Sequence, residues 1–202
     1  MRMCRVIAIA SQKGGVGKTT TAINLGACLA QEGRRVLLID IDPQANATSG
    51  MGISGNDRPA GTYEALLGAV RPSEATATTP LATMDVMPSA QRLSGAEIEL
   101  VGVDGWENRL RSVIDVLRLQ YDYILIDGPP SLGVLTVNAL VAADSVLIPL
   151  QCEYLALEGL TQLLSAIRRV QEKLNPGLRI EGVLLTMFSC CCAWGALLES
   201  DC

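Results

Sequence analysis

Short apolar runs alternate along this chain with longer segments whose apolar residues recur at helical spacing. Residues 36–39, Val-Leu-Leu-Ile, form a continuous apolar run, which is typical of a parallel strand covered on both faces. Residues 160–174 instead repeat leucine, isoleucine and valine every three or four positions, which predicts one buried stripe of a helix ending before Asn175-Pro176-Gly177. This alternation predicts an α/β fold: an open, mostly parallel sheet with helices on both faces and ligands at the carboxyl ends of the strands.

The predicted elements follow in a regular order. We expect strands at 5–10, 35–40, 84–87, 123–127, 145–150 and 180–186. We expect helices at 18–31, 63–67, 106–119, 132–142 and 160–174, with mostly connecting structure over 50–80. Gly33 is a plausible C-terminal cap of the first long helix. The leucines of the last helix are predicted to be core residues rather than a dimerisation zipper.

A glycine-rich loop follows the first predicted strand and leads into the first helix. It reads Lys13-Gly14-Gly15-Val16-Gly17-Lys18-Thr19-Thr20. Glycines let backbone N–H groups curl around an anion with no Cβ in the way, and a helix N-terminus favours phosphate. Lys18 then places a charge at the β- and γ-phosphates, and the Thr19 hydroxyl is a ligand for Mg²⁺. The eight residues therefore predict a nucleotide-phosphate site.

Several segments together resemble the ParA/MinD family of ATPases. The loop has Gln12 where the general phosphate loop has its first glycine, and Lys13 matches the extra signature lysine of the family's deviant Walker A motif. Residues 36–50 are similar to the second family motif, and residues 123–133 resemble its Walker B strand and following loop. Residues 144–160 look like the next strand and helix of the chromosome- and plasmid-partitioning branch, called ParA or Soj.

The resemblance implies ATP and Mg²⁺ as ligands and gives roles to single residues. Lys13 would reach across a two-fold dimer to the phosphates of the partner's ATP, and Asp42 would position or activate the attacking water. Asp127 follows four apolar residues and is the natural holder of a metal-bound water, while Asp40 would sit near the metal shell. The expected catalytic residues are Lys13, Lys18 and Asp42, and the expected metal-associated residues are Thr19, Asp40 and Asp127.

The implied function is a slow ATPase that works as a switch in chromosome or plasmid partitioning. The family's pattern is ATP-dependent dimerisation, non-specific DNA binding by the dimer, and stimulation by a ParB-like centromere-binding partner in a cytoplasmic, nucleoid-associated setting. A MinD-like membrane-associated protein is an alternative, but it requires a basic amphipathic C-terminal helix, and the last residues of this chain lack Lys and Arg. A non-catalytic fragment that binds nucleotide poorly is a second alternative.

The charge and hydropathy of the chain limit the kinds of partner that it can bind. No apolar run reaches the length needed to cross a membrane, and the first run is too short for a signal peptide. The net charge of −5 argues against a globally basic nucleic-acid coat, so DNA binding needs a local patch. Two groups of cations could supply it, with solvated helix faces as the equally good alternative. They are Arg109, Arg111 and Arg118, and Arg168, Arg169 and Lys173.

The chain departs from the family pattern in two places. Ala45 replaces a glycine that is common in the second motif, and the resemblance stops after Phe188. We therefore expect an ATPase domain over 1–188 that lacks its C-terminal elements, impaired DNA binding, and a poorly packed non-family tail over 189–202. We also expect buried thiols at Cys4, Cys28 and Cys152, and no metal at the cysteine-rich tail.

Overall fold

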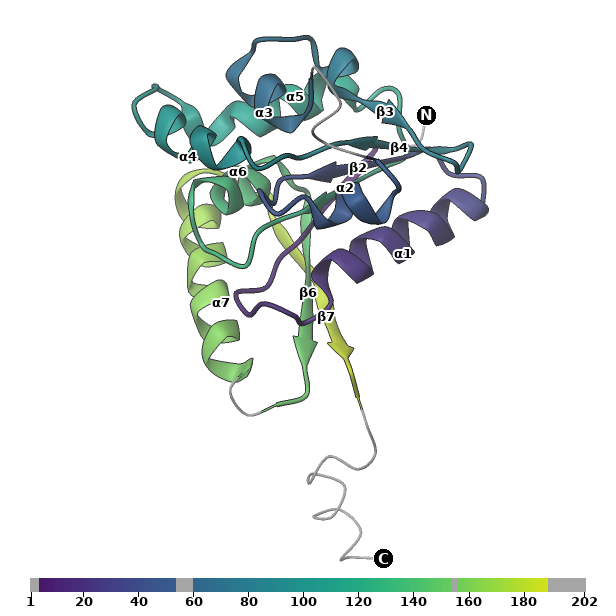
Figure 1. The fold of residues 1–202 in the computed structure, drawn as a ribbon. Coiled ribbons are helices and arrows are strands. Elements are labelled where there is room, and N and C mark those ends of the chain that lie inside the picture. The colour runs from purple at the N-terminus through teal and green to yellow at the C-terminus, as the bar shows by residue number, and fades with distance from the viewer. Residues whose placement is uncertain (1–3, 54–59, 154–155, 189–202) are drawn as a thin grey trace, which may run out of the picture.

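The computed structural model describes residues 4–53, 60–153 and 156–188. They form one seven-stranded sheet in the order β3-β4-β2-β5-β1-β6-β7 (Figure 1). Among the described strands, only the β3–β4 pair is antiparallel. The structure thus confirms the predicted open, mostly parallel sheet with helices on both faces. The predicted tail over 189–202 lies outside the described residues.

The strands and helices lie close to their predicted places. The strands are β1 Arg5–Ile9, β2 Val36–Asp40, β3 Ala77–Thr78, β4 Met84–Met87, β5 Tyr123–Asp127, β6 Ser145–Gln151 and β7 Arg179–Thr186. The α-helices are α1 Lys18–Gln31, α2 Asn46–Gly50, α3 Thr62–Leu67, α4 Leu93–Val101, α5 Arg109–Leu117, α6 Val134–Ala142 and α7 Ala156–Lys173. The described residues also contain two 3₁₀ turns, η2 Pro72–Ala75 and η3 Trp106–Asn108.

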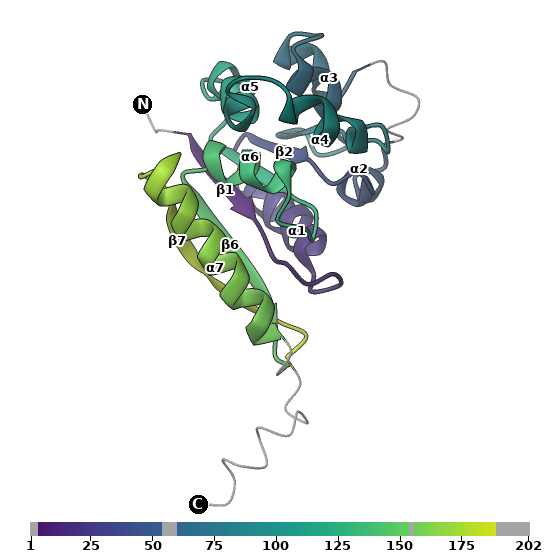
Figure 2. The same cartoon turned by 90° about the vertical axis from the view of Figure 1, so that its left-hand side faces the viewer.

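Alternate strand residues point to opposite sides of the sheet, and helices cover both of its faces. Ile7, Ile9 and Leu38 pack with α1 in one cluster, whereas Val6 and Leu37 pack with α5, α6 and α7 in the other. Figure 2 shows these two helix layers on either side of the strands. In α7 the residues Leu163, Ile167 and Val170 are buried, so the prediction of a core stripe is confirmed. No helix within the described ranges is long and apolar enough to span a membrane.

Some local predictions were incomplete or wrong. The sequence reading missed α2, β3 and α4; in α4 the apolar pattern is blurred because Ile98 is 82% exposed. The helix expected at 106–119 begins as a 3₁₀ turn and becomes α-helical only at Arg109. The prediction of a buried thiol is correct for Cys4 but wrong for Cys28, which is exposed, and Cys152 is half-buried. The apolar residues around Cys28 in the sequence did not indicate that this side of α1 faces solvent.

The strand β7 forms one edge of the sheet within the described residues. It runs parallel to β6, and most of its side chains are exposed. The exposed side chains include large apolar ones: Val183 is 48% exposed and Leu185 is 57% exposed. The part of the chain that the structure describes therefore presents an uncovered strand edge beside the phosphate loop.

Candidate nucleotide site

The glycine-rich loop takes the backbone shape that its glycines were expected to allow. It runs from the end of β1 to the first residue of α1, and Gly15 and Gly17 have φ values of 74° and 85°. These left-handed conformations carry a steric penalty for residues with a Cβ. The loop therefore directs its backbone toward the N-terminus of α1, where unpaired N–H groups and the helix dipole favour a phosphate.

Lys18 lies inside this loop. The residue is only 7% exposed, and its Nζ donates a hydrogen bond to the carbonyl oxygen of Lys13 at 3.1 Å. Burial lowers the pKa of Lys18, while the nearby charges of Asp127 and Asp42 act in the opposite direction. A buried ammonium group held by a single backbone carbonyl is well placed to interact with an anion in the loop.

The strand register brings Thr19 and Asp127 together. The ends of β1 and β2 both pair with Asp127 on β5, through Ile9 and Asp40. Thr19 Oγ1 donates a 2.7 Å hydrogen bond to Asp127 Oδ2 at the start of α1. Asp127 Oδ1 is buried and has no hydrogen-bond partner among the residues that the structure describes. Burial, joined by the charges of Asp40 and Asp42, raises the pKa of Asp127 to about 7.

These observations fit a divalent cation. A positive ion, or a water bound to it, would satisfy the orphaned oxygen of Asp127 and favour its ionised form. A hydroxyl beside a carboxylate is the hard oxygen donor set that Mg²⁺ takes. No group of three His, Cys, Asp or Glu side chains is arranged to hold a metal ion within the described ranges. A cation here would therefore need further oxygen ligands from phosphate and water.

Both carboxylate oxygens of Asp40 accept hydrogen bonds from the segment that follows it. Its Oδ2 accepts hydrogen bonds from the backbone N–H and the hydroxyl of Thr48 at 2.8 and 2.7 Å, and its Oδ1 accepts one from the N–H of Asp42 at 3.1 Å. Burial raises the pKa of Asp40 to about 6. The geometry makes Asp40 an organiser of residues 42–48. Its expected place near the metal shell stays a prediction.

Asp42 follows β2 and is 8% exposed. One carboxylate oxygen caps the backbone N–H of Gln44 at 2.9 Å. Its charge contributes to the shifts of both Lys18 and Asp127, so it shares their site. The structure thus gathers the predicted Lys18, Thr19, Asp42 and Asp127 at the carboxyl ends of β1, β2 and β5.

The Lys13 ammonium group contacts two other side chains, Gln151 and Glu153. Its Nζ forms a 2.6 Å ion pair with Glu153, and Gln151 Oε1 lies 3.5 Å from the same nitrogen. Gln151 also donates a 2.8 Å hydrogen bond to Glu153. The sequence reading did not single out Gln151, the last residue of β6, or Glu153, which is 140 residues from Lys13 in the sequence. In the sequence, the segment 151–153 carries only the family resemblance.

Two other contacts support the loops of the site. Thr186 at the end of β7 donates a 2.8 Å hydrogen bond to the carbonyl of Val16, which braces the phosphate loop from the sheet edge. Ala45 adopts a left-handed conformation with φ 53° just before α2. A glycine would adopt this conformation without penalty, whereas alanine costs roughly 1 kcal/mol. The substitution noted in the sequence therefore falls on a strained position.

Comparison with known proteins agrees with this geometry. The profile of the family described as an AAA domain matches residues 4–180. The chain is 56% identical over 185 residues to the sporulation initiation inhibitor protein Soj of Bacillus subtilis, covering 92% of this chain and 73% of that protein. It is 58% identical to the chromosome partitioning protein ParA of Myxococcus xanthus, covering 91% of this chain and 65% of that protein.

Solved structures give the same result. The cobyrinic acid a,c-diamide synthase of Mycobacterium smegmatis with bound ADP and magnesium superposes with a TM-score of 0.92 at 44% identity, covering 98% of this chain and 81% of that one. A putative plasmid partition protein of Borrelia burgdorferi bound to AMPPNP has a TM-score of 0.84 at 33% identity, with coverage of 98% and 82%. Fold and loop together define a P-loop nucleoside-triphosphatase. Within that class, the chain belongs to the ParA/Soj type of the ParA/MinD family.

Proposed function

We propose that this chain is an ATP-dependent dimerising switch for chromosome or plasmid partitioning, with slow intrinsic ATP hydrolysis. The observation that supports this most is the division of the two loop lysines. Lys18 is buried in the loop beside Thr19 and Asp127, whereas Lys13 is partly exposed and pairs with Glu153. One lysine is thus placed for the chain's own nucleotide, and the other is available for a second subunit.

The binding part of the proposal rests on the loop. Backbone N–H groups of residues 13–20 and the Lys18 ammonium would hold the phosphates of ATP. Thr19 and Asp127 would hold Mg²⁺, which neutralises phosphate charge when it is bound. Asp40 would act by shaping the loop over 42–48 through its bonds to Thr48.

The hydrolytic part rests on Asp42. As a carboxylate near the phosphate loop, it would orient or deprotonate the attacking water. The sequence contains no histidine, so this role has no imidazole to assist it. Hydrolysis with a single positioning carboxylate is expected to be slow, which suits a switch better than a metabolic enzyme.

Lys13 would act in trans. Its ion pair with Glu153 joins side chains that are 35% and 48% exposed, and such pairs contribute only about 0.2–1 kcal/mol. Exchange of Glu153 for the phosphates of a partner's ATP is therefore energetically accessible. ATP would then hold two subunits together, and hydrolysis would release them.

The proposed cellular role is taken from the relatives that this chain resembles in sequence. The partitioning proteins are more similar in sequence than the diamide synthase, at 56% and 58% against 44%. We accordingly propose non-specific DNA binding by the ATP dimer, a ParB-like partner that stimulates hydrolysis, and a cytoplasmic, nucleoid-associated location. With a net charge of −5, the DNA contact would be a local cationic patch.

Light scattering with Mg-ATP tests the role of Lys13. The unsubstituted chain should shift from monomer to dimer, whereas Lys13→Ala should bind Mg-ATP in calorimetry and stay monomeric. Glu153→Gln is the matched control, because it removes the ion pair but keeps the lysine, and it should still dimerise. A normal ATP-dependent dimer of Lys13→Ala would show that Lys13 is ordinary loop charge.

A further inference from the structure

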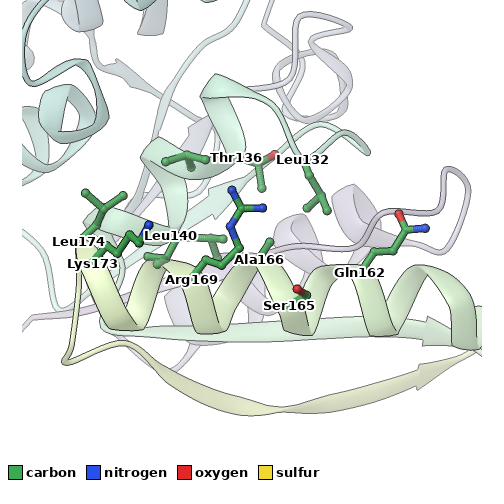
Figure 3. Close-up of a pocket in the computed structure, with 11 residues that line it drawn as sticks. Leu132, Thr136, Leu140, Gln162, Ser165, Ala166, Arg169, Lys173 and Leu174 are labelled. Atoms are coloured by element: carbon green, nitrogen blue, oxygen red, sulfur yellow. The ribbon is translucent and has the colours of Figure 1, made fainter.

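A cavity of about 470 Å³ lies between α6 and α7, apart from the residues of the nucleotide site (Figure 3). Its size is in the range of pockets that bind small molecules or several side chains of a peptide. Eleven residues from α6, α7 and their flanking loops line it. They are Leu132, Thr136, Val137, Leu140, Gln162, Ser165, Ala166, Arg169, Val170, Lys173 and Leu174.

The charge of this pocket is unbalanced. Arg169 and Lys173 lie four residues apart on α7, so both extend along the same side of the helix. The lining residues include no carboxylate, and neither cation forms an ion pair within the described part of the chain. The remaining walls are mostly aliphatic. Two unpaired cations over aliphatic walls complement a ligand that combines carboxylates with apolar groups.

We propose that the α6–α7 pocket binds an acidic amphipathic segment of a partner protein. Apolar side chains of that segment would fill the aliphatic walls, and its carboxylates would pair with Arg169 and Lys173. Figure 3 shows the Arg169 side chain pointing from α7 toward Leu132 and Thr136, where it faces such a ligand. A protein segment fits better than DNA, because a phosphate backbone offers nothing to the aliphatic walls. The third cation of the sequence patch, Arg168, is not among the lining residues.

The pocket also contacts the phosphate loop. Gln162, at one end of the lining, accepts a hydrogen bond from Gln12 Nε2. Gln12 directly precedes Lys13, and its other amide atom, Oε1, is buried and has no hydrogen-bond partner in the described part of the chain. A ligand that moves Gln162 would therefore disturb the residue beside the trans-acting lysine. This coupling rests on the proposed function, whereas binding to the pocket does not.

Fluorescence anisotropy with the full chain tests the binding. The probe is a labelled helical peptide with leucines along one face and two glutamates four positions apart. The unsubstituted chain should bind it, and Arg169→Gln combined with Lys173→Gln should weaken binding at least about tenfold, since two charge-assisted pairs are lost. Arg168→Gln on the same helix is the matched control and should change the affinity less than about twofold.

A second variant tests whether the double variant loses peptide binding merely because it misfolds. Ser165 is an exposed lining residue, and Ser165→Glu would place a carboxylate in the pocket, so it should also block the peptide without removing either cation. The proposal is overturned if the glutamate peptide does not bind, or if a version with glutamine in place of glutamate binds equally well. It is also overturned if Arg168→Gln is as damaging as the double variant. Loss of DNA duplex binding in the double variant, without peptide binding, would identify a nucleic-acid contact instead.

The coupling between the pocket and the nucleotide site is tested by a separate measurement. The peptide should change the affinity for Mg-ATP at least about twofold, and by linkage Mg-ATP should change the peptide affinity by the same factor. Gln12→Leu, which removes the same hydrogen bond at a residue outside the pocket lining, should keep peptide binding within about threefold but abolish this mutual effect. If Mg-ATP binds and the peptide does not alter its affinity, the coupling is wrong. If no nucleotide binds while the peptide does, the proposed function fails, the coupling falls with it, and the pocket assignment stands.

Discussion

The strands β2 and β7 have similar apolar sequences but opposite surroundings. All five residues of β2 are buried between neighbours on both sides, whereas β7 is paired only with β6 and is largely exposed in the described structure. An apolar run therefore indicates a strand without indicating how well it is covered. Coverage depends on which segments lie beside it, and these are set by the topology of the whole sheet.

The candidate nucleotide site likewise lies in the buried centre of the sheet and not at the edge strand β7. The candidate nucleotide site lies where the central strands β1, β2 and β5 end, and its carboxylates are buried there at Asp40, Asp42 and Asp127. The edge strand supports that site through the hydrogen bond from Thr186 to the phosphate loop. The buried centre should therefore be sensitive to single polar changes, and the edge should tolerate them.

The largest effect is expected at Lys18. Lys18→Ala removes the buried ammonium beside the phosphate position, so binding of Mg-ATP should become weaker than about 1 mM, with little left to measure by calorimetry. Lys13→Ala is the control on the same loop and should keep its affinity for the nucleotide. Retention of the original Mg-ATP affinity by Lys18→Ala would refute the phosphate-loop assignment.

A change at Asp42 should separate hydrolysis from binding. Asp42→Ala should bind Mg-ATP and accumulate as the ATP-bound dimer, while hydrolysis slows by about 10²–10⁴-fold because the water loses its orienting group. Asp85→Ala serves as the control, since Asp85 bonds to Tyr121 and takes no part in the site. Steady-state phosphate release measures the rate, and a variant as fast as the original chain would remove Asp42 from the mechanism.

The smallest effect is expected at the edge. Leu185→Lys places a charge on an exposed position of β7, where it should reduce concentration-dependent self-association in nucleotide-free sedimentation experiments. Stability should change by no more than roughly 0.5 kcal/mol. Ile98→Lys, at an exposed apolar position of the helix α4, should leave association unchanged. Equal association of Leu185→Lys and the original chain would mean that the edge is not adhesive.

Much of the fold could be predicted from the sequence because its signals are local. The helix α1 and the strands β4 and β5 have the bounds that periodicity and turn residues predicted. Gly33 has a φ of 73°, the left-handed conformation expected where α1 ends. In contrast, α4 was not predicted, since its apolar residues point both into the core and into solvent.

The residues that the structure brings together at the candidate site were predictable from the sequence, but their contacts were not. The loop motif and the aspartates after two apolar strands indicated Lys18, Thr19 and Asp127. The pairing of Lys13 with Glu153 depends on the register of β1 against β6, which no local pattern encodes. The bonds of Asp40 to Thr48 likewise arise from the turn into α2.

Hydrogen exchange with and without Mg-ATP tests the central claim most directly, because it reads the buried centre and the edge in one experiment. Mg-ATP should slow amide exchange across residues 13–20 and 40–48 and at the end of β5, and leave residues 179–184 of β7 unchanged. The contrary result would be an unprotected phosphate loop, or protection of β7 equal to that of the loop, and either would contradict the placement of the nucleotide at the ends of the central strands.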